Sequence, residues 1–143
     1  MSIPGSAKGA KRKARGPRPF RHLVLLLDYR EPGHVLIDLK PTALRPLAWK
    51  LLMHLAGAAG SVVPYGELYQ ELWGDTVVEM NQLSYQKNAV LSAIAEVAPR
   101  HRNVILTFPK IGFMLDLSPR EVLILPGETL GNVVQHLRQS FLR

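Results

Sequence analysis

The chain has 143 residues, a length typical of one domain, and 47% of them are hydrophobic, which excludes a wholly disordered chain. It contains no cysteine, so disulfides, thiolate nucleophiles and cysteine zinc sites are excluded. The formal net charge is +7. The longest apolar run, residues 23–27, is far short of the roughly 20 residues of a membrane-spanning helix, so we expect a cytoplasmic protein without a membrane span.

The positive charge is concentrated in an N-terminal arm, residues 1–22. The arm contains no acidic residue, whereas the remaining residues hold equal numbers of basic and acidic side chains. Its glycines, prolines and few apolar residues predict that it is disordered on its own. Clustered cations bind phosphate backbones without reading sequence, so we expect DNA contacts from Lys8, Lys11, Arg12, Lys13, Arg15, Arg18 and Arg21. An acidic partner, an anionic membrane, or a tail that only aids solubility are the alternatives.

Two short apolar segments open the body of the chain. Residues 23–27 read as a strand, residues 31–33 (Glu-Pro-Gly) as a turn, and residues 34–39 as the returning strand. The pattern predicts an antiparallel hairpin.

Three helices are predicted next. Pro46 opens the first at the position where a missing amide donor costs nothing, and Leu51 and Leu55 lie on its apolar stripe. Residues 62–64 are extended, and the second helix covers about residues 65–72, ending at Gly74. Asn81 is the expected N-cap of the third helix, residues 82–97.

A second hairpin follows the third helix, from residues 104–108 to residues 112–117, with its turn at residues 109–110. Strands, three helices and a hairpin in this order predict an α+β winged helix-turn-helix fold. We place this domain at residues 23–118, between the arm and a C-terminal extension at residues 119–143. The extension reads as a strand, residues 122–125, and an amphipathic helix, residues 128–142.

Three motifs in the same order resemble the DNA-binding domain of OmpR/PhoB-type transcriptional regulators, in particular the ToxR/CadC-like branch. Residues 44–52 (LRPLAWKLL) are similar to the first helix of that family. Residues 60–63 (GSVV) and 72–74 (LWG) are similar to its Gly-x-Val-Val and Val-Trp-Gly elements, and residues 107–113 (TFPKIGF) to its wing motif. The resemblance covers about residues 35–117.

The resemblance implies transcriptional regulation without catalysis. The third helix would enter the major groove of double-stranded DNA, the wing would reach an adjacent minor groove, and residues 74–80 would face RNA polymerase. On the helical wheel, Ser84, Tyr85, Asn88 and Ser92 lie away from the apolar face, and Gln86 is at the border. Asn and Gln can pair with adenine, while Tyr and Ser can reach phosphates or base edges.

Lys87 falls on the apolar face of the third helix, from which it can extend toward a phosphate or serve a structural role. Thr107 and Lys110 are the expected DNA contacts of the wing. The family usually carries an arginine-rich third helix, whereas residues 79–97 contain only Lys87 as a basic residue. We therefore expect weak DNA binding by the body alone, compensated by the arm.

A second interpretation is a degenerate winged helix that serves as a protein-interaction module. It is motivated by the apolar wing residues Ile111 and Met114 and by the apolar stripe of the C-terminal helix, Leu130, Val134, Leu137 and Phe141. That stripe needs a cover, either the N-terminal sheet or a second copy in a homodimer. RNA binding through the arm is a third interpretation.

Enzymatic chemistry is not expected. Residues 84–87 match a Ser-x-x-Lys spacing, but no other feature of such acyl enzymes is present. The five histidines show no paired metal-ligand spacing, and no phosphate-binding or dinucleotide motif occurs, so neither a metal nor a cofactor is predicted. A DNA-binding protein of this kind would be associated with the bacterial nucleoid.

Overall fold

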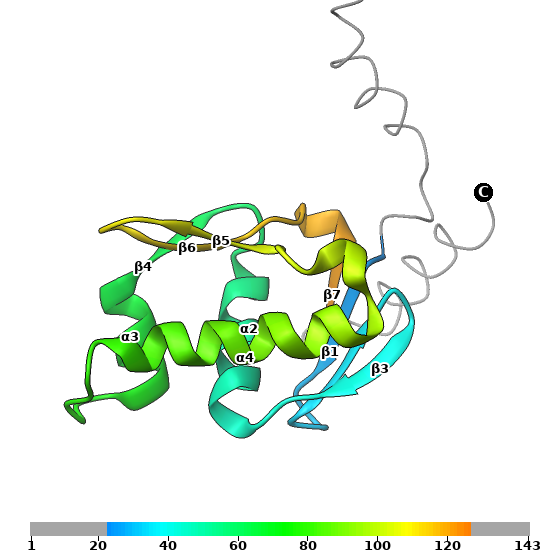
Figure 1. Cartoon of the computed structure of the whole chain (residues 1–143). Coiled ribbons are helices and arrows are strands. Elements are labelled where there is room, and N and C mark those ends of the chain that lie inside the picture. The colour runs from blue at the N-terminus through cyan, green and yellow to red at the C-terminus, as the bar shows by residue number, and fades with distance from the viewer. Residues whose placement is uncertain (1–22, 127–143) are drawn as a thin grey trace, which may run out of the picture.

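A computed structural model describes residues 23–126 of the chain (Figure 1). Its helices are α2 (Pro46–Gly57), α3 (Tyr65–Trp73) and α4 (Asn81–Val97). Its strands are β1 (Leu25–Asp28), β2 (His34–Ile37), β3 (Lys40–Ala43), β4 (Val62–Pro64), β5 (Ile105–Phe108), β6 (Gly112–Leu115) and β7 (Val122–Leu125). The three helices lie between an N-terminal sheet and a wing hairpin, so the predicted α+β winged-helix fold is confirmed.

The N-terminal sheet has the strand order β3-β2-β1-β7. The predicted hairpin is present, with Leu26 of β1 opposite Leu36 of β2. Strand β7 lies parallel to β1 on its other side, with Leu26 opposite Leu123. The strand of the expected C-terminal extension is therefore part of the same sheet as the N-terminal hairpin.

Strand β3 was not predicted. A two-residue turn connects it to β2, and both turn residues, Asp38 (φ 52°) and Leu39 (φ 65°), have left-handed backbone conformations. Two consecutive positive φ angles match the type I′ turn that suits a tight hairpin, although Leu is an unusual residue there.

The inner face of the sheet packs on α2. Leu51, Leu52 and Leu55 of α2 are 0% exposed, and they share one core with the buried residues Leu25 and Leu27 of β1. Burying a leucine stabilises a fold by about 1.5–3 kcal/mol. This packing fixes α2 as the support against which α3 and α4 are placed.

Helix α4 begins one residue earlier than predicted. Its first residue is Asn81, and Met80 occupies the N-cap position without a side-chain cap, so the prediction that Asn81 caps the helix was wrong. The predicted apolar face is confirmed for Leu83, Val90 and Ile94, which are buried.

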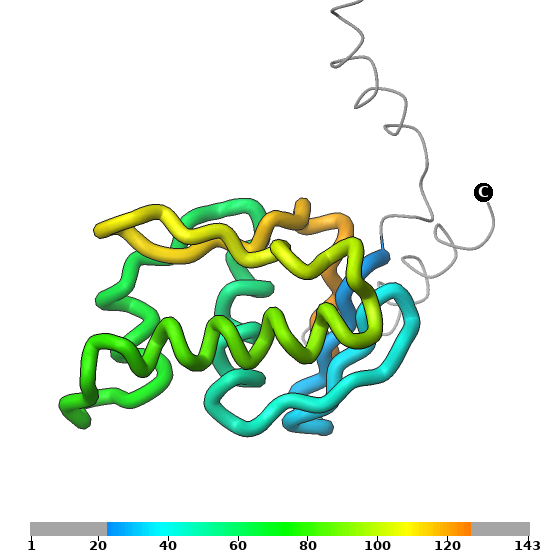
Figure 2. The backbone as a smooth tube through the Cα atoms, in the orientation of Figure 1, coloured from blue at the N-terminus to red at the C-terminus, as the bar shows by residue number. Residues whose placement is uncertain are grey.

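The wing is the hairpin of β5 and β6, joined by β4 in the order β4-β6-β5. Lys110 in its turn has a φ of 67°. Gly112 lies so close to β4 that an added Cβ atom would be 1.9 Å from the backbone oxygen of Val63. Figure 2 shows the wing running alongside α4, with its tip on the side of α3.

Candidate nucleic-acid interface

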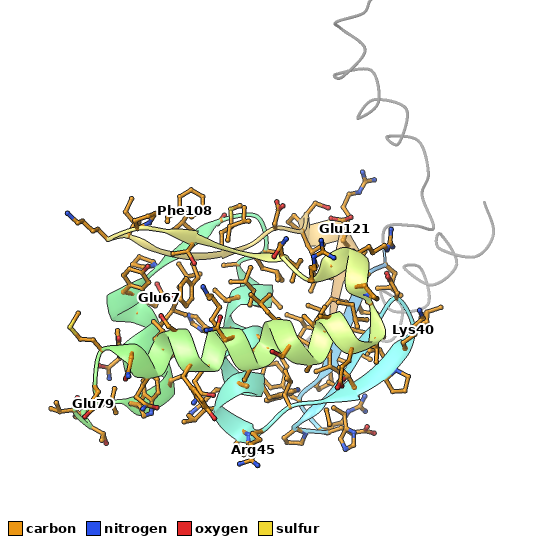
Figure 3. All side chains as sticks on the ribbon, in the orientation of Figure 1. Lys40, Arg45, Glu67, Glu79, Phe108 and Glu121 are labelled. Atoms are coloured by element: carbon orange, nitrogen blue, oxygen red, sulfur yellow. The ribbon has the colours of Figure 1, made fainter. Side chains whose placement is uncertain are left out.

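The outward face of α4 is polar and accessible. Ser84, Asn88 and Ser92 are exposed, and 67% of the surface of Tyr85 is exposed, so all four lie where the helical wheel placed them. Figure 3 shows α4 at the front of this view, with side chains along both of its sides. A helix with an exposed polar face of this kind can enter a major groove.

Gln86 belongs to the opposite face. Only 8% of its surface is exposed, because it follows Leu83 by three residues and precedes Val90 by four, and both neighbours are core residues. It is the only buried polar residue among those described. The helical wheel placed Gln86 at the border between the two faces, and the structure buries it on the apolar face, so its side chain is not part of the exposed polar surface.

Lys87 connects α4 to the wing. Its ammonium group donates a hydrogen bond to Oγ1 of Thr107 over 3.0 Å and lies 5.3 Å from the ring centroid of Phe113. The side chain is half-buried, with its apolar stem against the domain. Two residues expected to contact DNA thus contact each other.

The wing presents one basic and one large apolar residue at its tip. Lys110 is exposed, and 56% of the surface of Ile111 is exposed. Met114 lies further back, half-buried in β6 between Val62 of β4 and Leu106 of β5. The tip can therefore meet either a phosphate through Lys110 or an apolar surface through Ile111.

The described residues carry almost no net charge. Residues 23–126 contain nine Lys and Arg against ten Asp and Glu. Two of the arginines are held in ion pairs, Arg30 with Asp28 and Arg100 with Asp38, at 2.9 Å each. The hydrogen bonds from Arg100 hold the pKa of Asp38 below its usual range. Little positive charge is thus left to attract a phosphate backbone.

The loop between α3 and α4 carries exposed apolar side chains that the sequence interpretation missed. Val77 is 94% exposed and Met80 is 88% exposed. The Tyr69 hydroxyl donates a hydrogen bond to the backbone oxygen of Met80 over 2.9 Å, which anchors the end of the loop to α3. Three apolar residues within residues 77–80 were the signal available in the sequence.

A pocket of about 410 Å³ opens beneath this loop. Its lining combines aromatic rings with the start of α4, and the lining residues are Tyr65, Tyr69, Val78, Met80, Leu83, Ser84 and Phe113. The loop and the pocket together form an apolar surface beside the N-terminal end of α4.

Other predicted features fall outside this surface or outside the described residues. The seven basic arm residues and Leu130, Val134, Leu137 and Phe141 lie outside residues 23–126. Within that range, no three His, Cys, Asp or Glu side chains are grouped to hold a metal ion. A search of residues 23–126 for helices that could span a lipid bilayer finds none.

No protein-family model matches the sequence, and no curated protein matches it. Two solved domains are among those to which the structure is similar. One is the DNA-binding domain of Escherichia coli CadC, with 20% identity, a TM-score of 0.53, and coverage of 60% of this chain and 80% of that chain. The other is the C-terminal domain of the nisin resistance regulator NsrR, a lantibiotic response regulator, with 22% identity, a TM-score of 0.53, and coverage of 66% and 93%. Both similarities support the winged-helix fold.

Proposed function

We propose that this protein is a DNA-binding transcriptional regulator in which α4 enters the major groove of double-stranded DNA. The observation that carries the proposal is the exposed polar face of α4 beside the wing, in a fold shared with a domain described as DNA-binding. Fold alone does not fix function, so the proposal depends on the side chains of this face.

Base reading is assigned to the middle of α4. Asn88 can donate to and accept from the major-groove edge of adenine, the pairing that Asn makes with two hydrogen bonds. Tyr85 and the two serines, Ser84 and Ser92, carry hydroxyl groups that reach phosphates or base edges from the same exposed face.

Phosphate contacts are assigned to the wing and to Lys87. Lys110 at the wing tip is exposed and makes no ion pair within residues 23–126. Lys87 donates one of its three N–H groups to Thr107. The other two can bind a phosphate that lies between α4 and the wing.

The arm supplies the charge that the body lacks. Residues 23–126 carry one more acidic than basic residue, whereas residues 1–22 carry seven basic residues and no acidic one. Each phosphate that a cation neutralises adds about −0.9 to the slope of log K against log salt. We therefore assign nonspecific affinity to the arm and sequence preference to α4.

Selection of bound fragments tests the proposal. The full chain is mixed with sheared genomic DNA, and bound fragments are sequenced over repeated rounds. Enrichment of one sequence motif by the wild-type protein, and its loss with Asn88→Ala, is the expected result. A library that stays random after several rounds contradicts base reading by α4.

The second candidate is a protein-interaction module, and the exposed apolar residues favour it. Val77, Met80 and Ile111 expose large apolar surfaces on the loop and at the wing tip. RNA polymerase, another protein or a second copy of the chain would bind there. Ile111→Asp and Met80→Asp should then abolish the complex, whereas an unchanged hydrodynamic radius and retained partner binding would count against this candidate.

A further inference from the structure

The N-terminal sheet carries apolar side chains on its outer face as well as on its inner face, although polar residues such as Asp28 and His34 border the outer ones. Leu25 and Leu27 of β1 point to the inner face and belong to the core with α2. Side chains alternate along a strand, so Leu26 points to the outer face. The strand register places Leu36 and Leu123 opposite Leu26, one on each side. Three leucines from three neighbouring strands therefore form a continuous outer stripe.

This outer stripe is separate from the core that the described helices cover. Leu26, Leu36 and Leu123 are absent from the core around α2, α3 and α4, although Leu123 is only 1% exposed. A pocket of about 260 Å³ lies on the same face, where Leu26, Leu36 and Pro41 line it together with the polar residues Asp28, Glu31, His34 and Thr42. A sheet with two apolar faces is stable in water only when both faces are covered.

We propose that the C-terminal segment of this chain, residues 127–143, covers the outer face of the sheet as an amphipathic helix. The position at which the described part of the chain ends supports the choice of this segment. Strand β7 is an edge strand of the sheet and ends at Leu125, so the segment leaves the domain directly beside the outer stripe.

The sequence of the segment fits the surface. At helical spacing its apolar residues fall on one stripe, and they are Leu130, Val133, Val134, Leu137 and Phe141. A helix over residues 128–142 is about 22 Å long, and four strands about 4.8 Å apart span about 14 Å, so the helix is long enough to cross them. Docking there leaves α4 and the wing uncovered, because the outer face is turned away from α2.

Cross-linking tests this placement. Because the chain contains no cysteine, only the two introduced thiols can react. The full chain with Leu36→Cys and Val134→Cys is treated with a short bis-maleimide at low protein concentration. The matched control combines Val134→Cys with Lys50→Cys, which lies on the exposed side of α2. We expect a cross-link within one chain that forms about tenfold faster than in the control, because docking raises the effective concentration of the two thiols.

Each other outcome overturns the proposal. A cross-link between two chains assigns the stripe to a second copy. Equal rates for the test and control pairs mean that the segment does not dock on the sheet.

A pair of substitutions gives an independent measurement. Val134→Asp places a charge in the apolar stripe and should lower the melting temperature of the full chain by about 5 °C. Gln139→Asp introduces the same charge on the opposite side of the helical wheel and should leave the melting temperature unchanged. Equal effects of the two substitutions would contradict docking through the stripe.

Discussion

Lys87 of α4 and Thr107 of β5 are joined by a hydrogen bond of 3.0 Å, which links the candidate recognition helix directly to the wing. The same ammonium group lies 5.3 Å from the ring centroid of Phe113 in β6. A cation held over an aromatic ring and by a hydroxyl is restricted in position. The angle between α4 and the wing is therefore set in part by one basic side chain.

Lys87→Met and Thr107→Val should be coupled in their effect on stability. Removing either partner breaks the same hydrogen bond, so the double variant should lose about 0.5–1 kcal/mol less than the sum of the single variants. Urea denaturation of the four proteins measures this coupling energy. Lys50→Met, on the exposed side of α2, is the control and should add to Thr107→Val without coupling. Strict additivity for the Lys87 pair would mean that the contact contributes nothing to the free energy of unfolding.

Tyr85→Ala and Asn88→Ala should weaken sequence preference without unfolding the domain. Both side chains are exposed, so their removal leaves the core intact. A base contact with two hydrogen bonds contributes about 1–3 kcal/mol of discrimination, which predicts a loss of roughly tenfold to hundredfold in the ratio of specific to nonspecific affinity. The matched control is Asn103→Ala, in the turn before β5. Unchanged preference in both variants would reject α4 as the reading element.

Gly112→Ala should disrupt the wing. The new Cβ atom would lie 1.9 Å from the backbone oxygen of Val63, so β4 and β6 must separate. We expect the free energy of unfolding to fall by about 2–3 kcal/mol. Gly66→Ala is the control, because no atom lies within 4 Å of the Cβ position there. That variant should be neutral or more stable by up to about 1 kcal/mol, and similar losses in both variants would refute the steric explanation.

Asp38→Asn should lower stability in a pH-dependent way. The Asp38 carboxylate accepts two hydrogen bonds of 2.9 Å from Arg100, and Asn tolerates the left-handed backbone at this position. Because the Arg100 side chain is 69% exposed, solvent screens the pair and the expected loss is only about 1 kcal/mol at neutral pH.

The sign of the pH effect follows from the pKa of Asp38. Hydrogen bonds from Arg100 lower this pKa in the folded state. The stabilisation is therefore complete above the unfolded-state pKa and is lost as pH falls through the lower folded-state pKa. Urea denaturation at pH 7 and at about pH 3 should show the difference between wild type and Asp38→Asn shrinking. A difference that stays constant would exclude the charge as its cause.

The elements with local signals were predictable from the sequence. Pro46 marks the start of α2, and Gly74 marks the end of α3. Residues 109–110 mark the wing turn after β5. Each of these positions requires a particular backbone conformation, which the residue type signals. Strand β3 was not predictable, since its sequence KPTA lacks apolar alternation and its turn has no glycine or asparagine. The parallel pairing of β7 with β1 joins residues about a hundred positions apart, which no local pattern encodes.

The candidate interface was predictable in outline but not in its contacts. Helical periodicity correctly separated the exposed residues Ser84, Tyr85 and Asn88 from the core. The helical wheel put Gln86 at the border, and packing beside Leu83 and Val90 decides that it is buried. The Lys87–Thr107 bond depends on how the wing folds back over α4, and that geometry comes from tertiary packing.

The salt dependence of DNA binding tests the central claim most directly. Affinities of the full chain and of a chain beginning at His22 are measured from low to high salt, on an enriched fragment and on random duplex. We predict that the shorter chain keeps its preference for the enriched fragment while its affinity falls and its salt slope becomes shallower, because the seven arm cations are gone. If the shorter chain binds no DNA and neither chain prefers any fragment, base reading by α4 is contradicted and a protein partner becomes the function to pursue.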